Sequence, residues 1–194
     1  FSKWHGLGND FIFVNGFEEP VNNARQIAPF VCDRHFGIGA DGLVLVLPSS
    51  CADFRMQIFN SDGSEAQMCG NATRCFSRYV HSNRLTNKRD LTIETLAGII
   101  HASLIGDGTQ IQVNLGAPRL TRREVPVSGD PDSHAIEIPV SIDGVTFKAT
   151  CVSTGVPHCV IFVDSWKDLD WQQIGRKIEN HPLFPQKTNV EFIQ

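Results

Sequence analysis

The sequence predicts an α+β fold with mostly antiparallel sheet, divided into two strand-rich domains. Alternating apolar and polar residues around glycine turns predict hairpins in both parts of the chain. Apolar residues three and four positions apart predict helices between the strands. A segment rich in proline, glycine and charge, 116–132, separates the two parts. Since 194 residues suffice for two small cores, we predict domains over 1–117 and 118–194.

The predicted first domain alternates strands with two helices. Ile12, Val14 and Phe17 follow a Gly-Asn-Asp turn and predict an early strand. Apolar spacing predicts a helix over 22–36, ended by Gly37, and a second helix over 70–83. Apolar runs and alternation predict further strands at 43–47, 53–59, 91–95, 99–105 and 109–115, the last two joined as a hairpin by Gly106-Asp107-Gly108.

The predicted second domain is a hairpin followed by a strand, a helix and a strand. Ile136, Ile138 and Val140 alternate with polar residues, Asp143-Gly144 marks a tight turn, and residues 145–151 alternate again. The elements predicted after this hairpin are a strand at 157–163, a helix at 168–180 and a strand at 189–193.

Composition excludes several classes of partner. The chain has 17 Lys and Arg against 21 Asp and Glu, a net charge of -4, which leaves no positive surplus to neutralise the phosphates of a nucleic acid. Its longest apolar runs fall far short of the roughly 20 residues that span a bilayer. No secretion signal is recognisable, so we expect a cytoplasmic protein with no nucleic-acid or membrane partner.

Six cysteines occur, at positions 32, 51, 69, 75, 151 and 159. A chain of this length does not need disulfides for stability, and we predict free thiols, with Cys32, Cys75 and Cys151 in the core. The closest spacings to a metal motif are Cys32 with His35 and His158 with Cys159, and neither has a matching second pair. We therefore predict no structural zinc.

The glycines of residues 37–42 match the G-x-G-x-x-G pattern of dinucleotide-binding loops. That function requires a strand before the glycines and a helix after them. Here the predicted helix comes first and the predicted strand second, so no helix amino terminus can receive a pyrophosphate. We interpret this segment as a tight connection.

The clearest candidate for chemistry is Cys69, within Met68-Cys69-Gly70-Asn71 at the start of a predicted helix. Helix amino termini carry partial positive charge and open N–H groups, which favour the thiolate form of a cysteine. Gly70 removes side-chain bulk, and the N–H groups at 70–72 could hold a carboxylate. The alternative is a small buried cysteine that merely precedes a helix.

Three further residues stand at the edges of predicted strands. His158 follows Gly155-Val156-Pro157, where it could act at a cleft as an acid, a base or a hydrogen-bond partner. Asn9 and Asn189 also precede strands, where amides bind ligands or cap turns. For each of them a purely structural role is the alternative.

Several motifs follow one another along the whole chain. They are His5-Gly6-Leu7-Gly8-Asn9-Asp10-Phe11, the segment 34–42, the segment 59–74, Leu85-Thr86, the segment 155–160 and Thr188-Asn189. Together, and in this order, they resemble diaminopimelate epimerase. This resemblance implies a fold of two similar halves, each with strands wrapped around a helix, facing each other across a cleft.

The resemblance implies cofactor-independent inversion at the α-carbon of LL-diaminopimelate, which gives the meso isomer used for lysine and peptidoglycan synthesis. The family uses two cysteines, and Cys69 matches the first. Inversion needs a base on one face and an acid on the other, because one group returning its proton restores the starting configuration. By resemblance, His158 lies near the thiols, and Asn9, Asn60, Gly70, Asn71 and Asn189 contact the substrate. A small amino acid is thus the expected partner, and a homodimer is compatible with the resemblance.

Three departures from the family pattern affect these expectations. Val156 replaces an asparagine of a Gly-Asn-Pro-His motif, and Gly42 stands where some members have glutamine, so substrate identity is affected more than reaction type. The family's second cysteine lies in an Ala-Cys-Gly motif, after a Glu-Arg pair, beyond the position of Gln194. We therefore expect a fragment with an incomplete second half that does not epimerise by itself.

Other functions fit parts of the pattern. A proline racemase or hydroxyproline epimerase would share Met-Cys-Gly, but there a histidine usually stands at the place of Asn71. A cysteine hydrolase would use His158 to deprotonate Cys69, and it needs an oxyanion site and a group that orients the histidine. A non-catalytic domain that binds ligand is the third alternative.

Overall fold

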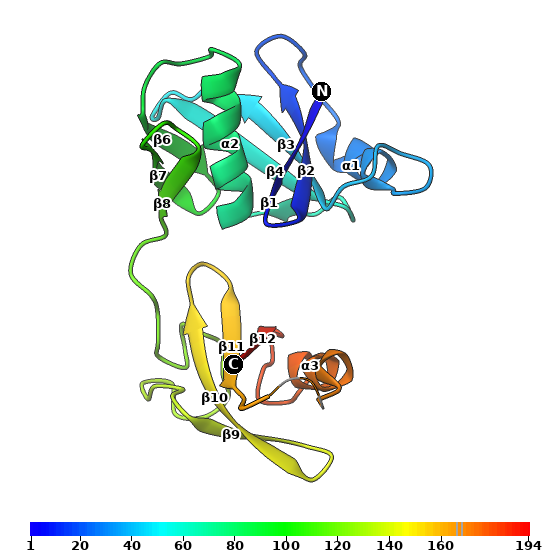
Figure 1. The fold of residues 1–194 in the computed structure, drawn as a ribbon, viewed down its shortest axis with the longest axis vertical. Coiled ribbons are helices and arrows are strands. Elements are labelled where there is room, and N and C mark those ends of the chain that lie inside the picture. Colours follow the sequence, from blue (N-terminus) through cyan, green and yellow to red (C-terminus); the bar gives the residue numbers. More distant parts are fainter. Residues whose placement is uncertain (166, 168) are drawn as a thin grey trace. The chain divides into compact units, whose positions relative to one another are not determined.

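A computed structural model describes residues 1–165, 167 and 169–194. The chain forms two compact units, unit 1 over Phe1–Leu115 and unit 2 over Gly116–Gln194, and each is described by itself (Figure 1). The division falls at the start of the segment rich in proline and glycine. Within the described residues, no helix combines the length and the apolar character that crossing a membrane requires.

Unit 1 is built on one eight-stranded sheet with the strand order β1-β2-β3-β4-β6-β7-β8, in which the short β5 pairs with β4. Its strands are β1 (Ser2–Gly6), β2 (Asn9–Asn15), β3 (Gly42–Leu47), β4 (Phe54–Asn60), β5 (Glu65–Ala66), β6 (Asp90–Thr95), β7 (Gly98–Ile105) and β8 (Gln110–Asn114). Alternation along β2 places Phe11 and Phe13 on one face and Ile12 on the other, in separate apolar clusters. The sheet therefore has two buried faces.

Two helices cover these faces. Helix α2 (Gly70–Ser82) buries Ala72, Cys75, Phe76 and Val80 against the face that carries Phe13. It contacts both β1 and β8, the two edges of the sheet, so the sheet curls around this helix (Figure 1). Helix α1 (Ala24–Cys32) packs Ala24, Ala28 and Cys32 against the opposite face.

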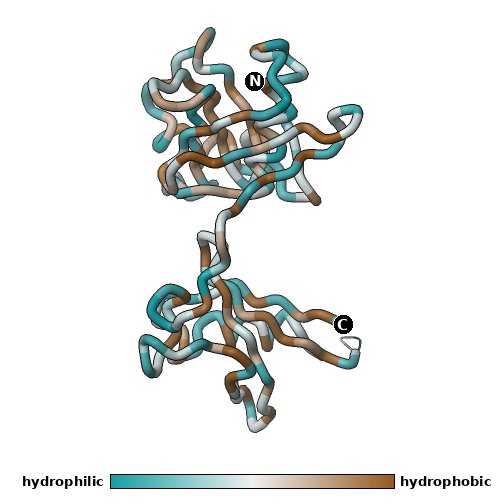
Figure 2. Tube along the Cα trace, turned by 90° about the vertical axis from the view of Figure 1, so that its left-hand side faces the viewer, coloured by the Kyte–Doolittle hydropathy of each residue, from teal (hydrophilic) through white to brown (hydrophobic). Residues whose placement is uncertain are grey.

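Unit 2 repeats this arrangement on a smaller scale. Its four strands are ordered β12-β11-β10-β9, with β9 (Ile138–Ile142), β10 (Val145–Ser153), β11 (Pro157–Phe162) and β12 (Asn189–Ile193). Helix α3 (Trp171–Glu179) contacts both edge strands, β9 and β12, and buries Ile178 in the core. Figure 2 shows hydrophobic and hydrophilic stretches interspersed along the chain in each unit, and along β9 buried positions alternate with exposed ones.

The predicted α+β class and the mostly antiparallel pairing are confirmed. Among the described residues, seven strand pairings are antiparallel and three are parallel, namely β2–β3, β4–β6 and β11–β12. The predicted hairpins at 99–115 and at 136–151 are present. Cys32, Cys75 and Cys151 lie in the cores as predicted, and all six cysteines are free.

Some element boundaries were predicted wrongly. The helix expected over 22–36 is α1, Ala24–Cys32, and it ends before Asp33 because that side chain accepts the N–H groups of His35 and Phe36, both at 2.7 Å. Phe17 lies outside β2, which ends at Asn15. Strands β1 and β5 were not predicted. Of the helix expected over 168–180, residue 168 lies outside the described residues, and α3 begins at Trp171.

Candidate active site

Cys69 stands immediately before α2, at the N-cap position, in extended backbone conformation with φ −145° and ψ 119°. The first helical turn closes on its carbonyl oxygen, which accepts the backbone N–H and the hydroxyl of Thr73, each at 2.9 Å. The Cys69 side chain makes no capping hydrogen bond to the helix and is half-buried. Its sulfur is therefore held at a helix start while remaining available for chemistry, as the sequence predicted.

The amino end of α2, next to this sulfur, has space beside Gly70. The first N–H groups of an α-helix have no partner within the helix, and they carry the positive end of its dipole. A Cβ added to Gly70 would meet only a methyl group of Leu115, at 3.8 Å. The glycine thus leaves space in which an anionic group could approach the backbone.

Asn9 lies against Cys69. A turn between β1 and β2, with positive φ at Leu7 and Gly8, brings Asn9 to the start of β2. The Oδ1 atom of Asn9 accepts a hydrogen bond from Sγ of Cys69 at 3.8 Å and another from Nδ2 of Asn71 at 3.2 Å. Asn71 is fixed in turn by Arg74, which donates to its Oδ1. The structure therefore brings Asn9 together with Cys69 and Asn71, two residues of one motif that lies some 60 positions further along the chain.

A cluster of ion pairs contacts the amide nitrogen of Asn9, on the side of the amide opposite to the Cys69 sulfur. Nδ2 of Asn9 donates to Oδ2 of Asp41 at 2.7 Å, and Arg34 donates both to Asp41 Oδ1 at 2.8 Å and to the two carboxylate oxygens of Asp10 at 2.8 and 3.2 Å. Lys3 pairs with Asp10 at 3.0 Å. Arg34 and, to a lesser degree, Lys3 hold the pKa of Asp10 well below its usual range.

Asn60 lies at the same end of the sheet. Gly42, the first residue of β3, is paired with Phe11 on one side and with Asn60 on the other, which places Asn60 in line with the start of β2. Its Nδ2 donates to the hydroxyl of Ser64 at 2.9 Å. The turn after it requires Gly63, whose φ is +84° and whose added Cβ would lie 2.5 Å from the carbonyl oxygen of Arg25.

Two predicted site residues, His158 and Asn189, belong to unit 2. They are register partners on the parallel strands β11 and β12. Nδ1 of His158 lies 2.7 Å from Oε1 of Glu191, and Nδ2 of Asn189 donates to the carbonyl oxygen of Pro157 at 3.1 Å. Within the described part of the chain, Oε2 of Glu191 is buried and has no hydrogen-bond partner.

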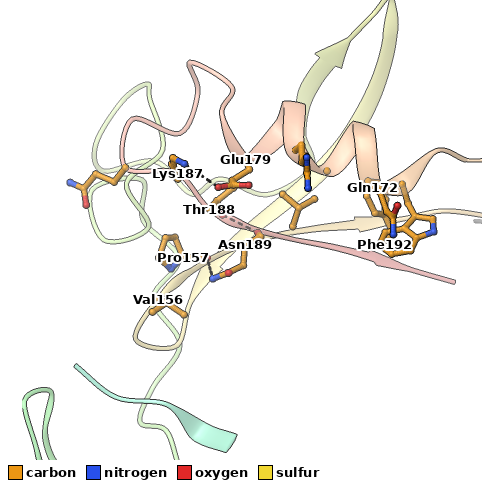
Figure 3. A pocket seen from close by; sticks show the side chains of 13 residues that line it. Val156, Pro157, Gln172, Glu179, Lys187, Thr188, Asn189 and Phe192 are labelled. Carbon is orange, nitrogen blue, oxygen red and sulfur yellow. Dashed lines mark hydrogen bonds and ion pairs between the residues drawn. The ribbon is translucent and has the colours of Figure 1, made fainter. Parts of the chain in front are cut away.

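Asn189 also lines a pocket of about 520 Å³ between α3 and β12. Figure 3 shows Val156, Pro157 and Asn189 at one side of this pocket and Gln172 with Phe192 at its far end. Lys187 and Glu179 form an ion pair at 3.2 Å over its wall. The pocket therefore offers amide, charged and aromatic groups to a small polar ligand.

The sequence did not nominate Asp41, Arg34 or Glu191 as site residues. Asp41 lies in the segment 37–42, which we interpreted as a connection, and Arg34 lies in the helix predicted over 22–36. In the structure both residues stand between α1 and β3, and both belong to the cluster of ion pairs that contacts Asn9. Glu191 could have been found, because it stands two residues after Asn189 on the same strand and so shares its face.

Comparison with known proteins identifies the family of this chain. The sequence model of the family described as diaminopimelate epimerase matches residues 1–121 and 150–194. A diaminopimelate epimerase of Acetivibrio thermocellus is 51% identical over 197 residues, an alignment that covers all of this chain and 70% of the relative.

Solved structures show the fold. A phenazine biosynthesis protein of the PhzF family from Bacillus anthracis has a TM-score of 0.56 at 23% identity, covering 84% of this chain and 53% of that one. A hydroxyproline epimerase from Agrobacterium vitis has a TM-score of 0.54 at 16% identity, covering 83% and 44%. The family match over most of the chain and the high identity to a relative establish that this chain belongs to the diaminopimelate epimerase family.

Proposed function

We propose that the protein inverts the α-carbon of LL-diaminopimelate to give the meso isomer, without a cofactor, and that Cys69 is the proton-transfer group on one face of that carbon. The observation that carries this proposal is the place of Cys69, at the start of α2 and hydrogen-bonded to Asn9, in a chain that matches the family. A thiol can serve as acid and its thiolate as base in the same reaction.

Stereochemistry requires a second group. A proton removed from one face must be replaced from the other face, so a single thiol cannot invert the centre. The resemblance assigns the second thiol to an Ala-Cys-Gly motif, and the 194 residues contain no such motif. We infer that this chain alone does not epimerise, and that a chain carrying both motifs does.

The amino end of α2 suits the substrate's α-carboxylate. Removing the α-proton places negative charge next to this carboxylate, and N–H groups at a helix start stabilise both charges. Gly70 supplies the space, and Asn71 supplies an amide that Arg74 already orients.

Residues of unit 2 are proposed to complete substrate recognition. Asn189 offers an amide at the rim of the pocket beside α3, and His158 is oriented by Glu191. The apolar Val156, also on this rim, cannot hydrogen-bond as the family's usual asparagine does. We therefore expect Val156 to affect the choice of substrate rather than the reaction.

Two further expectations concern the cellular compartment and the oligomeric state. Six free cysteines support a reducing compartment such as the cytoplasm. We also propose a homodimer, because the large apolar side chains of Phe30, on α1, and Phe36, after it, are exposed. Size-exclusion chromatography with light scattering tests this oligomeric state.

The test is exchange of the substrate α-hydrogen in deuterated water, with a chain that carries both motifs and no added cofactor. We expect deuterium incorporation together with inversion, and Cys69→Ala should lower both by at least about 100-fold. Cys75→Ala is the matched control, because this buried thiol lies in the same helix and should leave exchange unchanged. Unchanged exchange in Cys69→Ala would reject Cys69 as the catalyst.

Other outcomes separate the alternative functions. An acyl-enzyme trapped on Cys69 would support a cysteine hydrolase, for which the Glu191–His158 pair is the orienting contact that the sequence did not reveal. Faster turnover of proline or hydroxyproline would support the related racemases. Tight substrate binding without any exchange would support a ligand-binding domain.

A further inference from the structure

The amide of Asn9 is held at both ends, and its orientation has a chemical consequence. Its Nδ2 faces Asp41 at 2.7 Å, and its Oδ1 faces the Cys69 thiol. A carboxylate only accepts hydrogen bonds, so Asp41 requires the amide nitrogen on its own side. The amide oxygen is thereby turned toward the sulfur, where it can accept the S–H proton.

Asp41 is itself fixed by donors on both oxygens. Oδ2 accepts from Asn9 and from the backbone N–H of Asp10 at 3.0 Å, and Oδ1 accepts from Arg34 at 2.8 Å. An amide group at position 41 would have to place its NH₂ either against the Arg34 guanidinium or against Asn9 and the backbone donor. Both placements set donor against donor, so Asp41→Asn should weaken the set of contacts that orients the Asn9 amide.

We propose that Asp41 is a positioning residue that, through Asn9, keeps a hydrogen-bond acceptor on the Cys69 sulfur and so favours the protonated thiol while no substrate is bound. This inference rests on the proposed function, in which Cys69 transfers protons. It adds a link between binding and ionisation: a substrate ammonium group that bound Asn9 Oδ1 would withdraw the acceptor, and the thiol would then lose its proton more readily.

The charged groups of the surrounding elements are already engaged with other partners. Arg74 on α2 donates to Asn71, Lys3 on β1 pairs with Asp10, and Arg34 after α1 bridges Asp10 and Asp41. Cys75, which lies within α2, is buried, and its burial raises the pKa of its thiol. The contact that distinguishes Cys69 is therefore the neutral oxygen of Asn9.

The test is the rate at which iodoacetamide alkylates Cys69 in the native 194-residue chain, at pH 7 and at pH 10. Trypsin releases residues 56–74 as a peptide in which Cys69 is the sole cysteine, so mass spectrometry follows this thiol alone. Only the thiolate reacts. Loss of an acceptor from the S–H group should raise the ratio of the pH 7 rate to the pH 10 rate in Asp41→Asn by about threefold. Increased access alone would raise both rates equally.

A double-mutant cycle tests whether Asp41 acts through Asn9. Asn9→Ala should raise the ratio by itself, and Asp41→Asn added to Asn9→Ala should change it no further. Asp90→Asn is the matched control, since it also converts a carboxylate of unit 1 into an amide. Asp90 accepts a hydrogen bond from Ser103, which belongs to none of the contacts described for Asn9, Asp41 and Cys69. The exposed Cys51 gives an internal reference for the reagent.

An unchanged ratio in Asp41→Asn, an equal rise at both pH values, or an undiminished effect in the Asn9→Ala background would each overturn the proposal. Where circular dichroism shows that Asp41→Asn does not fold, Arg34→Gln replaces it, because Arg34 is exposed and holds Asp41 from outside; an unchanged ratio in that variant also contradicts the proposal. The readout involves no epimerisation, so its failure is distinguishable from failure of the proposed function.

Discussion

Oε1 of Glu191 lies 2.7 Å from Nδ1 of His158, across the parallel strands β12 and β11. A carboxylate accepts hydrogen bonds and cannot donate them, so the Nδ1 of His158 must carry its proton. In the neutral ring the other nitrogen, Nε2, is then left with a free lone pair. The contact therefore presents Nε2 as the nitrogen that can accept a proton or a hydrogen bond.

The tautomers of two histidines should accordingly differ. We expect nitrogen-15 NMR to show neutral His158 protonated on Nδ1, and Glu191→Ala to shift that proton toward Nε2. His181 is the internal control, because its Nδ1 accepts the backbone N–H of Leu183 at 3.2 Å and its neutral ring must be protonated on Nε2. Protonation of His158 on Nε2 in the unaltered chain would contradict the orienting role of Glu191.

The thiols should differ in accessibility in the native chain. Burial raises the pKa of the Cys75 thiol and removes it from solvent, whereas Cys69 is half-buried and Cys51 is exposed. We expect alkylation to be fast at Cys51, measurable at Cys69 and at least about 100-fold slower at Cys75, as it requires local unfolding. Peptide mass spectrometry measures all three. Equal reactivity of Cys75 and Cys69 would remove the distinction on which the choice of Cys69 depends.

Gly63 should be essential for the turn that positions Asn60. An alanine there meets a positive φ of +84° and a carbonyl oxygen of Arg25 at 2.5 Å. Gly98 is the matched control, since its φ is +107° but nothing lies within 4 Å of an added Cβ. We expect Gly63→Ala to lower the free energy of unfolding of unit 1 by about 1–3 kcal/mol more than Gly98→Ala does. Hydrogen exchange of the buried β3 and β4 amides measures this difference, and equal losses would contradict it.

The pH dependence of stability should reveal the ion pairs of Asp10. Arg34 and Lys3 hold its pKa below the unfolded value of 3.8, so the stabilisation is fully present above about pH 4 and is lost as pH falls toward the lowered folded pKa. We expect urea unfolding, followed by circular dichroism at pH 7, 5, 4 and 3, to show a shallower decline for Asp10→Asn than for the unaltered chain. Asp90→Asn, at an exposed carboxylate, should decline like the unaltered chain; identical curves for all three would contradict the prediction.

Local patterns sufficed for much of the fold. The apolar spacing of α2 and the alternation of β10 each reflect one buried face, and such periodicity is visible in a single segment. Strand β5 could not be found this way, because two residues contain no period. Helix α1 ended earlier than its apolar pattern because the Asp33 side chain captures the following N–H groups, which periodicity does not report.

The candidate site was predictable only in part, because some of its contacts join residues that are far apart in the sequence. Cys69 was identifiable because its chemistry depends on the adjacent helix start, which is local. Its contact with Asn9 joins residues 60 positions apart, and the contact of Asn9 with Asp41 joins residues 32 apart. The pairing of Asn9 with Asp41 follows from the register of β2 and β3, and the contact of Asn9 with Cys69 follows from the packing of α2 on β1, the partner of β2. No single segment encodes either. The resemblance to a family nominated Asn9, but the structure was needed to find what holds it.

The role of Cys69 in proton transfer fixes how far its Sγ lies from the α-carbon of bound diaminopimelate. A crystal structure of a chain carrying both motifs, with this ligand present, would measure this distance. We expect a separation of about 3.5 Å, the approach needed for proton transfer at that carbon, with the ligand carboxylate at the amino end of α2. A ligand whose α-carbon lies more than about twice as far from this sulfur would contradict this role of Cys69.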